Sequence, residues 1–545
     1  MENKTLFFGD NLDILRDKFQ DNSVDLIYLD PPFNSKRGYN ILFKEGLVES
    51  QAQVRAFEDS WSWTRETEKI FEELVTGKSK TQITAEISNL IKGFKSIIGQ
   101  NDVMAYLVMM TLRLIELHKV LKPTGSLYLH CDPTASHYLK IILDVIFGKK
   151  NFRNEIIWKR TNSPKSQTEA FGNQHDVLLF YTKSDKFTFH NQFRELDEAS
   201  LKPYRYQDEK GKFQTVAIIA GGIQKYAGRK KFEFRGVTAQ WLYTKDNLEK
   251  FWKQGLIHKT KSGYRLKKYL KDVKGLPISD LWVDKGVSPL QSAEWLGFQT
   301  QKPEALLERI ILTSSNKGDL ILDAFCGCGT TISVAEKLER KWVGIDITNL
   351  AINIMKHRLQ KQFNFTQRRI KVDIEGIPKD LAGAKELATK DRKGRFEFEY
   401  WALGLVNALP KRSKEKMYGA DEGIDGILVI KTSEKELQSL IVQVKSGKVK
   451  RDYIATLKGD VQREGAIGGV LITLQEPTKS MIEESNKAGF FESLLTKEKY
   501  PKIQIITIKE LFDGKRLNLP NNYSIYKDAK EVKLKSSGRQ KKLTF

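Results

Sequence analysis

The chain is poor in cysteine and in long apolar runs, and each shortage excludes a class of protein. Three cysteines in 545 residues are too few for a disulfide framework. No stretch reaches the roughly 18 consecutive apolar residues that a membrane-spanning helix needs, and residues 1–10 lack the pattern of a signal peptide. We therefore expect a soluble protein of a reducing compartment that has no membrane partner.

Acidic residues are also scarce. Asp and Glu number 68 against 91 Lys and Arg, which gives a formal net charge of +23 and a pI near 9.5. Residues 200–275 hold 19 basic and 6 acidic side chains, interleaved with aromatic residues and glycines. Cations bind backbone phosphates, and aromatic rings stack on unpaired bases. This pattern predicts a nucleic acid partner for the segment; the alternative is a solvated, irregular surface insertion.

Short apolar runs alternate with helical patterns along the first 360 residues. Residues 23–29 are apolar and bounded by turn residues and prolines, which is typical of a buried parallel strand. Residues 103–121 are apolar at helical spacing, and residues 126–130 form the next short apolar run. The alternation predicts an α/β fold with a doubly wound, mostly parallel sheet, and the length predicts two to four domains.

Two short motifs stand at the ends of predicted strands. Asp30-Pro31-Pro32-Phe33 follows the strand at 23–29, and the run DAFCGCGTT (residues 323–331) follows a strand at 319–322. The second motif places glycines between a strand and a helix, where a ligand can approach the backbone and the helix N-terminus. The cysteines at positions 326 and 328 make a poor zinc site, because the chain offers them no partners.

The order of these motifs resembles the circularly permuted β-class of DNA amino-methyltransferases, in which the catalytic motif precedes the motif for S-adenosylmethionine (SAM). The stretch LDPPFNSKRGYN (residues 29–40) is similar to modification subunits of type III systems. The resemblance covers residues 1–360 and implies a Rossmann-like SAM-dependent methyltransferase fold acting on double-stranded DNA. It also implies a set of cofactor-binding residues: Asp10, Lys302, Asp323, Phe325, Gly327, Gly329, Thr330 and Asp346.

The catalytic roles follow from the chemistry of an exocyclic amine, whose lone pair is delocalised into the base. Asp30 and the carbonyl of Pro31 would accept hydrogen bonds from the amine, while Pro31 and Pro32 fix the backbone. Phe33 would stack on the base once it has left the duplex. In the family, an aspartate at the first position usually goes with the N6 amine of adenine, so we expect an adenine methyltransferase; the N4 amine of cytosine is the alternative.

The C-terminal part carries a second resemblance. The motifs GADEGIDG (residues 419–426) and QVKSG (residues 443–447) follow a helix at 396–409 and resemble the Mrr-like PD-(D/E)xK nuclease core. The resemblance implies that Asp425 and Gln443 hold Mg²⁺, that Lys445 activates water, and that Glu399, or alternatively Glu397, completes the site from the helix. The alternative is an inactive nuclease fold that is kept for DNA binding.

These patterns predict an order of domains and a cellular setting. We expect a restriction–modification or defence protein of the cytoplasm, associated with the nucleoid. Homodimers are common among β-class relatives, and a restriction partner subunit is a further expectation. The predicted segments are a catalytic half (1–185), a target-recognition region (186–290), a SAM-binding half (291–365), a linker (366–395), a nuclease-type domain (396–525) and a basic tail (526–545).

Overall fold

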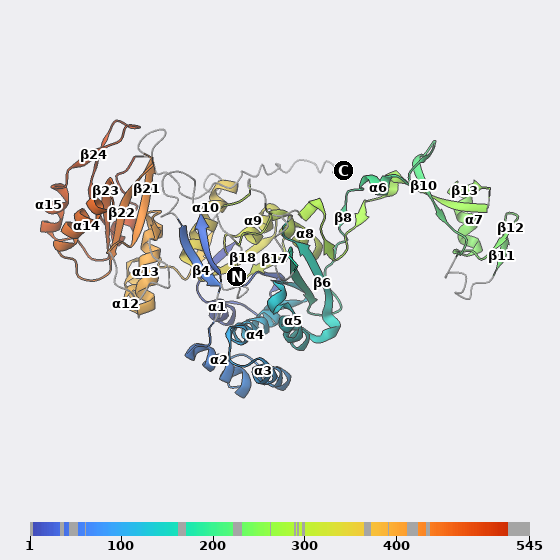
Figure 1. The fold of residues 1–545 in the computed structure, drawn as a ribbon, viewed down its shortest axis with the longest axis horizontal. Helices are drawn as coiled ribbons and strands as arrows, with labels where there is room; N and C mark the ends of the chain where they lie inside the picture. Colours follow the sequence, from blue (N-terminus) through green and yellow to red (C-terminus); the bar gives the residue numbers. More distant parts are fainter. Residues whose placement is uncertain are drawn as a thin grey trace. The chain divides into compact units, whose positions relative to one another are not determined.

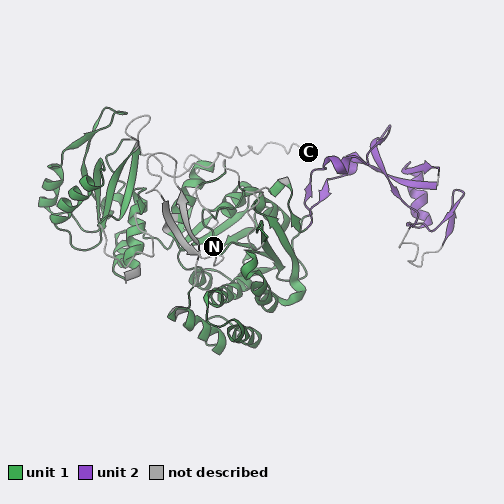
Figure 2. Cartoon of the chain, in the orientation of Figure 1, with its two compact units in different colours: residues 1–190, 280–545 green, residues 191–279 purple. Residues whose placement is uncertain are grey.

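The computed structural model of the chain divides into two compact units, one of residues 1–190 and 280–545 and the other of residues 191–279 (Figure 2). The described residues are 4–32, 37–42, 53–59, 62–161, 171–221, 231–261, 263–287, 290, 294–296, 300–363, 372–390, 392–410, 423–431 and 437–520. The basic tail and Phe33 lie outside them.

A nine-stranded sheet forms the centre of the larger unit (Figure 1). Only β5–β7 and β7–β6 pair antiparallel among the neighbours in this sheet. The predicted α/β fold with a doubly wound, mostly parallel sheet is therefore confirmed. In spatial order the strands are β16 (Leu281–Trp282), β6 (Phe152–Lys159), β7 (His175–Thr182), β5 (Leu121–Cys131), β2 (Val24–Leu29), β17 (Leu320–Asp323), β18 (Lys341–Asp346), β1 (Thr5–Phe8) and β19 (Asp373–Glu375).

The strands that precede the two motifs are neighbours in this sheet. Ile27 of β2 pairs with Leu322 of β17, although the two are almost three hundred residues apart in the sequence. The strands run parallel, so their carboxyl ends meet at one edge of the sheet. The permuted order along the chain therefore still brings the two motifs together in space.

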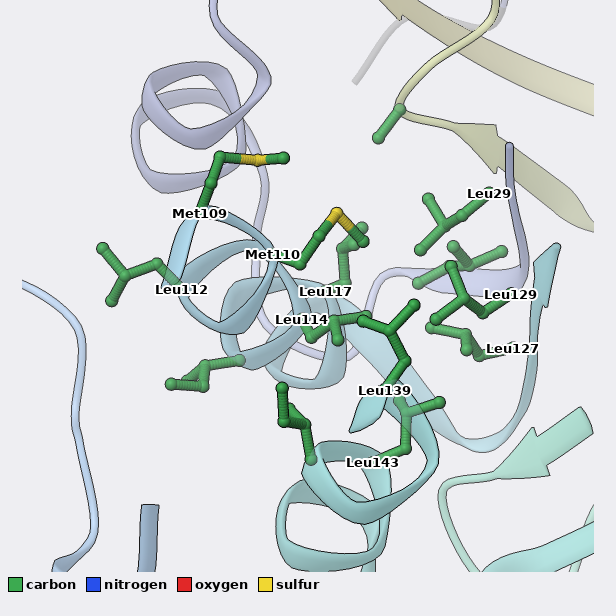
Figure 3. Close-up of a cluster of buried hydrophobic side chains, with 14 of the residues drawn as sticks. Leu29, Met109, Met110, Leu112, Leu114, Leu117, Leu127, Leu129, Leu139 and Leu143 are labelled. Atoms are coloured by element: carbon green, nitrogen blue, oxygen red, sulfur yellow. The ribbon is translucent and has the colours of Figure 1, made fainter. Parts of the chain in front are cut away.

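Apolar side chains on both faces explain why these strands are buried. On one face, the helix α4 (Asp102–Val120) packs through Met110, Leu114 and Leu117 against Leu29 and Leu129 (Figure 3). The other helices that flank or extend the sheet are α1 (Asn11–Lys18), α2 (Arg65–Thr76), α3 (Ala85–Ile98), α5 (Pro133–Leu143), α8 (Glu304–Ser314), α9 (Thr330–Lys337) and α10 (Asn349–Phe363). A separate hairpin pairs β3 (Arg37–Leu42) with β4 (Gln53–Asp59).

The smaller unit, residues 191–279, has its own aromatic core. Its four-stranded sheet has the order β13 (Ile257–Thr260), β14 (Gly263–Tyr269), β10 (Gly211–Ala217) and β9 (Tyr206–Asp208), and it also contains the helix α7 (Lys245–Lys253). Phe234, Trp241 and Tyr264 are buried and contact one another through their rings. These three rings stabilise the unit itself, so they are not available to stack on bases.

A second sheet lies near the C-terminus. Its order is β20 (Leu409–Pro410), β21 (Gly426–Lys431), β22 (Leu437–Lys445), β23 (Gly468–Thr473) and β26 (Ile503–Thr507). The helix α13 (Arg392–Leu405) contains residues 396–405 of the helix predicted at 396–409, whereas Leu409 belongs to β20. The helix α14 (Asp452–Arg463) connects β22 to β23. Among the described residues, no helix is long and apolar enough to cross a membrane.

Candidate active site

A cavity of about 250 Å³ lies where β1, β2, β17 and β18 end. Open α/β sheets bind ligands at this carboxyl edge, since the loops that leave neighbouring strands meet there. Most of the residues assigned from the sequence line the cavity: Asp10, Asp30, Pro31, Pro32, Lys302, Asp323, Phe325, Gly327, Thr330 and Asp346. Gly329 shapes the loop beside it, and Phe33 lies outside the described residues.

Asp30 forms an ion pair that the sequence did not predict. The Nζ atom of Lys302 lies 2.5 Å from Oδ2 of Asp30, and the side chains are 11% and 15% exposed. The sequence assigned Lys302 to the cofactor. The structure places it both in the cavity wall and against the proposed catalytic carboxylate, which it orients.

Glycine is required at two positions of the loop after β17. Gly327 and Gly329 have φ values of 49° and 75°, in the left-handed region. A Cβ on Gly329 would clash with the Met355 side chain of α10, so any other residue there would force that side chain to move. The amide of Gly327 donates a hydrogen bond of 2.9 Å to Oδ2 of Asp346, which fixes that carboxylate at the end of β18.

Asp323 is a buried carboxyl group at the start of the same loop. Its oxygens accept hydrogen bonds from the Thr331 hydroxyl at 2.5 Å and from the Phe325 amide at 3.1 Å. Burial raises the pKa of Asp323 to about 7, and the negative charges of Asp30 and Asp346 add to this shift. Near neutral pH this group therefore exchanges a proton, and its charge depends on what occupies the cavity.

Arg113 is a cavity residue that sequence reasoning missed. Its Nη2 lies 2.8 and 3.0 Å from the two carboxylate oxygens of Asp10, and its Nε donates to Asn11 at 2.5 Å. Asn11 in turn donates to the carbonyl of Ala324 in the loop after β17. The signal was present, because Arg113 is a charged residue within the mostly apolar run of residues 103–115.

A second missed feature is a buried polar chain behind Tyr28, whose ring lines the cavity. The Tyr28 hydroxyl lies 2.9 Å from Nδ1 of His130, and Nε2 of His130 lies 3.2 Å from Asp176. Burial and the charge of Asp30 raise the pKa of Tyr28 well above its usual value. Burial opposes ionisation of Asp176, yet the hydrogen bond from His130 and the charges of Lys302 and Arg160 lower its pKa. Tyr28 therefore stays a neutral phenol, and Asp176 stays ionised.

Asp176→Ala tests how much the hydrogen-bonded side chains of Tyr28, His130 and Asp176 contribute to stability. We expect the free energy of unfolding to fall by about 3 kcal/mol, because His130 and Arg160 lose a buried charged partner. Tyr28→Phe removes only one neutral hydrogen bond and should cost about 1 kcal/mol. Chemical denaturation of both variants measures the difference. An equal loss of unfolding free energy in the two variants would show that Asp176 contributes no more to stability than the Tyr28 hydroxyl does.

Of the residues assigned to the nuclease site, Gln443 and Lys445 lie on β22 and Asp425 directly precedes the neighbouring strand β21, and all three are engaged in other contacts. Oδ2 of Asp425 accepts a hydrogen bond from the Val444 amide at 2.7 Å and lies 3.9 Å from Nζ of Lys445. Gln443 is 1% exposed, and its Nε2 donates to Oδ2 of Asp460 at 2.7 Å. Glu399 is half-buried on α13.

Asp460, on α14, was not assigned from the sequence, and it also pairs with Arg463 at 2.8 Å. In the part of the chain that the structure describes, no group of three or more His, Cys, Asp or Glu could hold a metal ion. Of the two predicted Mg²⁺ ligands, Asp425 contacts a backbone amide and the Lys445 ammonium, and Gln443 points its amide nitrogen at Asp460.

A family model described as DNA methylase matches residues 24–357, which is more than half of the chain. The chain belongs to the DNA methylase family. Within this methylase, a further model described as "NACHT-associated inactive Restriction Endonuclease 1" matches residues 403–513. The predicted fusion of a methylase with a restriction-endonuclease-type domain is confirmed.

The methylase is similar to curated proteins over part of their length. It is 35% identical to the type II methyltransferase M.EcaI of Enterobacter cloacae over 260 residues, which are 47% of this chain and 57% of the relative. It is 27% identical to the StyLTI Mod subunit, a type III restriction-modification enzyme of Salmonella typhimurium, over 342 residues. These residues are 59% of this chain and 48% of the relative. The chain therefore spans about half the length of these relatives. The structure of an M1.HpyAVI–SAM complex matches 65% of this chain and 98% of its own, with 16% identity and a TM-score of 0.30.

Proposed function

We propose that this methylase transfers a methyl group from SAM to the N6 amine of adenine in double-stranded DNA. The observation that carries the proposal is the cavity itself. It brings Asp30, the glycine loop after β17 and the carboxylates of Asp323 and Asp346 together at one edge of the sheet. These residue types fit a cofactor that carries a ribose and a positively charged sulfur.

The protein residues would act by orientation and electrostatics. Asp346, held by the Gly327 amide, would accept the ribose hydroxyls. Asp30 and the Pro31 carbonyl would accept hydrogen bonds from the amine, which frees its lone pair for attack. SAM supplies an electrophilic methyl group on sulfur. The nitrogen–carbon bond would form as the carbon–sulfur bond breaks. The amine would lose one proton, and Asp30 is the proposed acceptor of that proton. Holding the two reactants in line contributes about 7–11 kcal/mol to such reactions.

Analysis of the modified base tests this function. Plasmid DNA incubated with the purified full chain and isotopically labelled SAM is digested to nucleosides, and the labelled nucleoside is identified by mass. We expect labelled N6-methyldeoxyadenosine with the wild type, and none with Asp30→Ala. N4-methyldeoxycytidine would keep the methyltransferase and overturn the adenine assignment. No label in either base would overturn the proposed activity.

We propose that residues 186–290 recognise the target sequence. The compact unit at 191–279 lies inside this segment, and most of the 19 basic side chains of residues 200–275 remain at its surface. Backbone phosphates account for much of DNA affinity, so binding should weaken steeply as salt concentration rises. A homodimer and a restriction partner subunit remain predictions that light scattering and co-purification would test.

We propose that the C-terminal domain is a nuclease fold that binds DNA without cutting it. Supporting this, the amide of Gln443 binds Asp460, and Asp425 is engaged by Val444 and Lys445. The name of the matching family also describes an inactive enzyme. The alternative remains Mg²⁺-dependent cutting with Asp425 and Gln443 as ligands, Lys445 activating water and Glu399 completing the site.

We expect supercoiled plasmid to stay intact when wild type is added with Mg²⁺, whether or not the plasmid is methylated. Asp425→Ala and Lys445→Ala should behave like the wild type in this assay. Gel electrophoresis of the plasmid gives the answer. Cutting by the wild type that disappears in both variants would establish the Mg²⁺ site and an active nuclease.

A further inference from the structure

The helix α8 is attached to both ends of the segment that contains residues 191–279. Before that segment, the His190 amide donates a hydrogen bond of 2.7 Å to the Thr313 carbonyl of α8. After it, Asp284 forms an ion pair with Arg309 in the middle of α8. These four residues all belong to the larger unit. Both connections of the smaller unit are thus anchored on one helix.

The ion pair between Arg309 and Asp284 has a defined geometry. Nη1 and Nη2 of Arg309 lie 2.9 and 2.6 Å from the two carboxylate oxygens of Asp284, and the side chains are 8% and 14% exposed. Cζ of Arg309 also lies 5.1 Å from the ring centre of Trp282. The hydrogen bonds from Arg309 lower the pKa of Asp284. The carboxylate therefore stays ionised, and the pair stays charged.

The turn after Asp284 is shaped around this ion pair. The Gly286 amide donates a hydrogen bond of 3.0 Å to Oδ1 of Asp284. A Cβ on Gly286 would lie 2.8 Å from that oxygen and 2.9 Å from Nη2 of Arg309, so even alanine would force the two charged groups to move. Gly286→Ala thus disturbs the pair while both charges remain.

The N-terminal end of α8 leads to the active site. Lys302 directly precedes Pro303, the N-cap of the helix, and its ammonium contacts Asp30. The helix is held in the core by fully buried apolar side chains, among them Leu306, Leu307 and Ile310. Closely packed side chains have little room to adjust. A displacement of α8 at Arg309 would therefore be passed along the helix to Lys302.

Positioning explains this ion pair better than stability does. Apolar side chains of similar volume usually stabilise a fold as well as a buried ion pair or better, because both charges must be removed from water. A bidentate pair instead favours one relative placement of the elements that carry it. Those elements are α8 and the segment that follows the smaller unit.

We propose that Arg309 is a positioning residue for methyl transfer. The inference rests on the proposed function. Through Asp284, Arg309 holds α8 in register with the segment that returns from residues 191–279. Through α8, it places the Lys302 ammonium against Asp30. The orientation of the catalytic carboxylate thereby depends on how the smaller unit is anchored.

Single-turnover transfer of labelled methyl to plasmid DNA at saturating SAM measures this role, together with the dissociation constants for SAM and for the same plasmid. In Arg309→Met we expect the rate to fall about 10- to 100-fold, since a misplacement of about 1 Å can cost about 10²-fold. Both dissociation constants should change by less than about threefold, because the pair positions the reacting groups and binds neither ligand.

Two further variants and a matched control define the effect. Gly286→Ala should also slow transfer, and Arg309→Lys should recover part of the rate, because it keeps the charge but not the bidentate geometry. Arg16→Met is the control. Arg16 is another largely buried arginine, which pairs with Glu73 and Glu116 and does not line the cavity. It should lose thermal stability and keep the wild-type rate within about twofold, as independent sites do.

A double variant tests whether Arg309 acts through Lys302. In the Lys302→Met background, Arg309→Met should slow transfer by less than about threefold further, because the effects of coupled residues do not add. Equal fold losses in the two backgrounds would overturn the inference. A wild-type rate in Arg309→Met, or a loss that is explained by weaker SAM or DNA binding, would overturn it too.

If Arg309→Met does not fold, Gly286→Ala decides by the same comparison. Its rate loss should disappear in the Lys302→Met background, and a loss that persists there would overturn the inference. Failure of the wild type to methylate plasmid DNA would instead refute the proposed function, so the two failures are distinguishable.

Discussion

Asp30→Ala is expected to slow methyl transfer by at least about 10³-fold. The variant removes the proposed acceptor for the amine and its proton, and loss of one such group typically costs about 10²–10⁴ in rate. Asp30→Asn keeps the shape and one acceptor oxygen but loses the charge, so its rate should lie between the wild type and the alanine variant. Single-turnover transfer of labelled methyl to plasmid DNA measures all three rates.

The control for Asp30 is Asp21→Ala. Asp21 is an exposed acid in the turn before β2, at the opposite end of the strand, and it pairs only at the surface with Lys119. We expect this variant to keep the wild-type rate within about twofold, as exposed pairs contribute little. Thermal melting tests whether Asp30→Ala is folded despite the loss of its ion pair with Lys302. A folded Asp30→Ala that retains a tenth of the wild-type rate would refute the catalytic assignment.

The second large effect is a pH dependence of cofactor binding that originates in Asp323. Its pKa is raised to about 7 in the free protein. The positive sulfur of SAM favours the ionised carboxylate, so binding should release a proton below that pH. We expect the affinity for SAM to rise by up to about tenfold per pH unit between pH 5 and 7 and to level off above. Calorimetry in buffers of different ionisation enthalpy counts the released proton.

S-adenosylhomocysteine is the matched ligand for this experiment, because its sulfur is neutral while the rest of the molecule is the same. Its affinity should vary much less with pH, and Asp323→Asn should remove the difference between the two ligands. A pH dependence of SAM binding that is unchanged in Asp323→Asn would show that another group titrates.

The same shift affects the stability of the free protein. Between pH 3.8 and about 7 the folded state binds more protons at Asp323 than the unfolded state. The contribution of Asp323 to the free energy of unfolding therefore decreases as pH rises through this window. Bound SAM should offset that loss.

Features that depend on neighbouring residues were predictable from the sequence. The glycines of residues 323–331 are needed for a left-handed turn, and the strands at 23–29 and 319–322 are fixed by continuous apolar runs. Such features arise within a few residues of chain, where backbone sterics and burial act directly. The methylase fold and its restriction-endonuclease-type fusion follow from motifs of this local kind.

Features that depend on distant partners were not predictable. Lys302 reaches Asp30 across 272 residues of chain, and His130 lies between Tyr28 and Asp176 on neighbouring strands. In residues 200–275 an aromatic ring that stacks on a base and one that fills a core have the same sequence signature. Only burial, as at Phe234 and Trp241, separates the two.

The sequence by itself determined the α/β fold, the two motifs and their permuted order, because these are set by local backbone chemistry and apolar periodicity. Only the tertiary structure decided which polar side chains meet: Asp30 with Lys302, Asp10 with Arg113, and Gln443 with Asp460. The physical reason is that an ion pair or a buried hydrogen bond depends on distances of about 3 Å. Only the packing of complete strands and helices sets such distances.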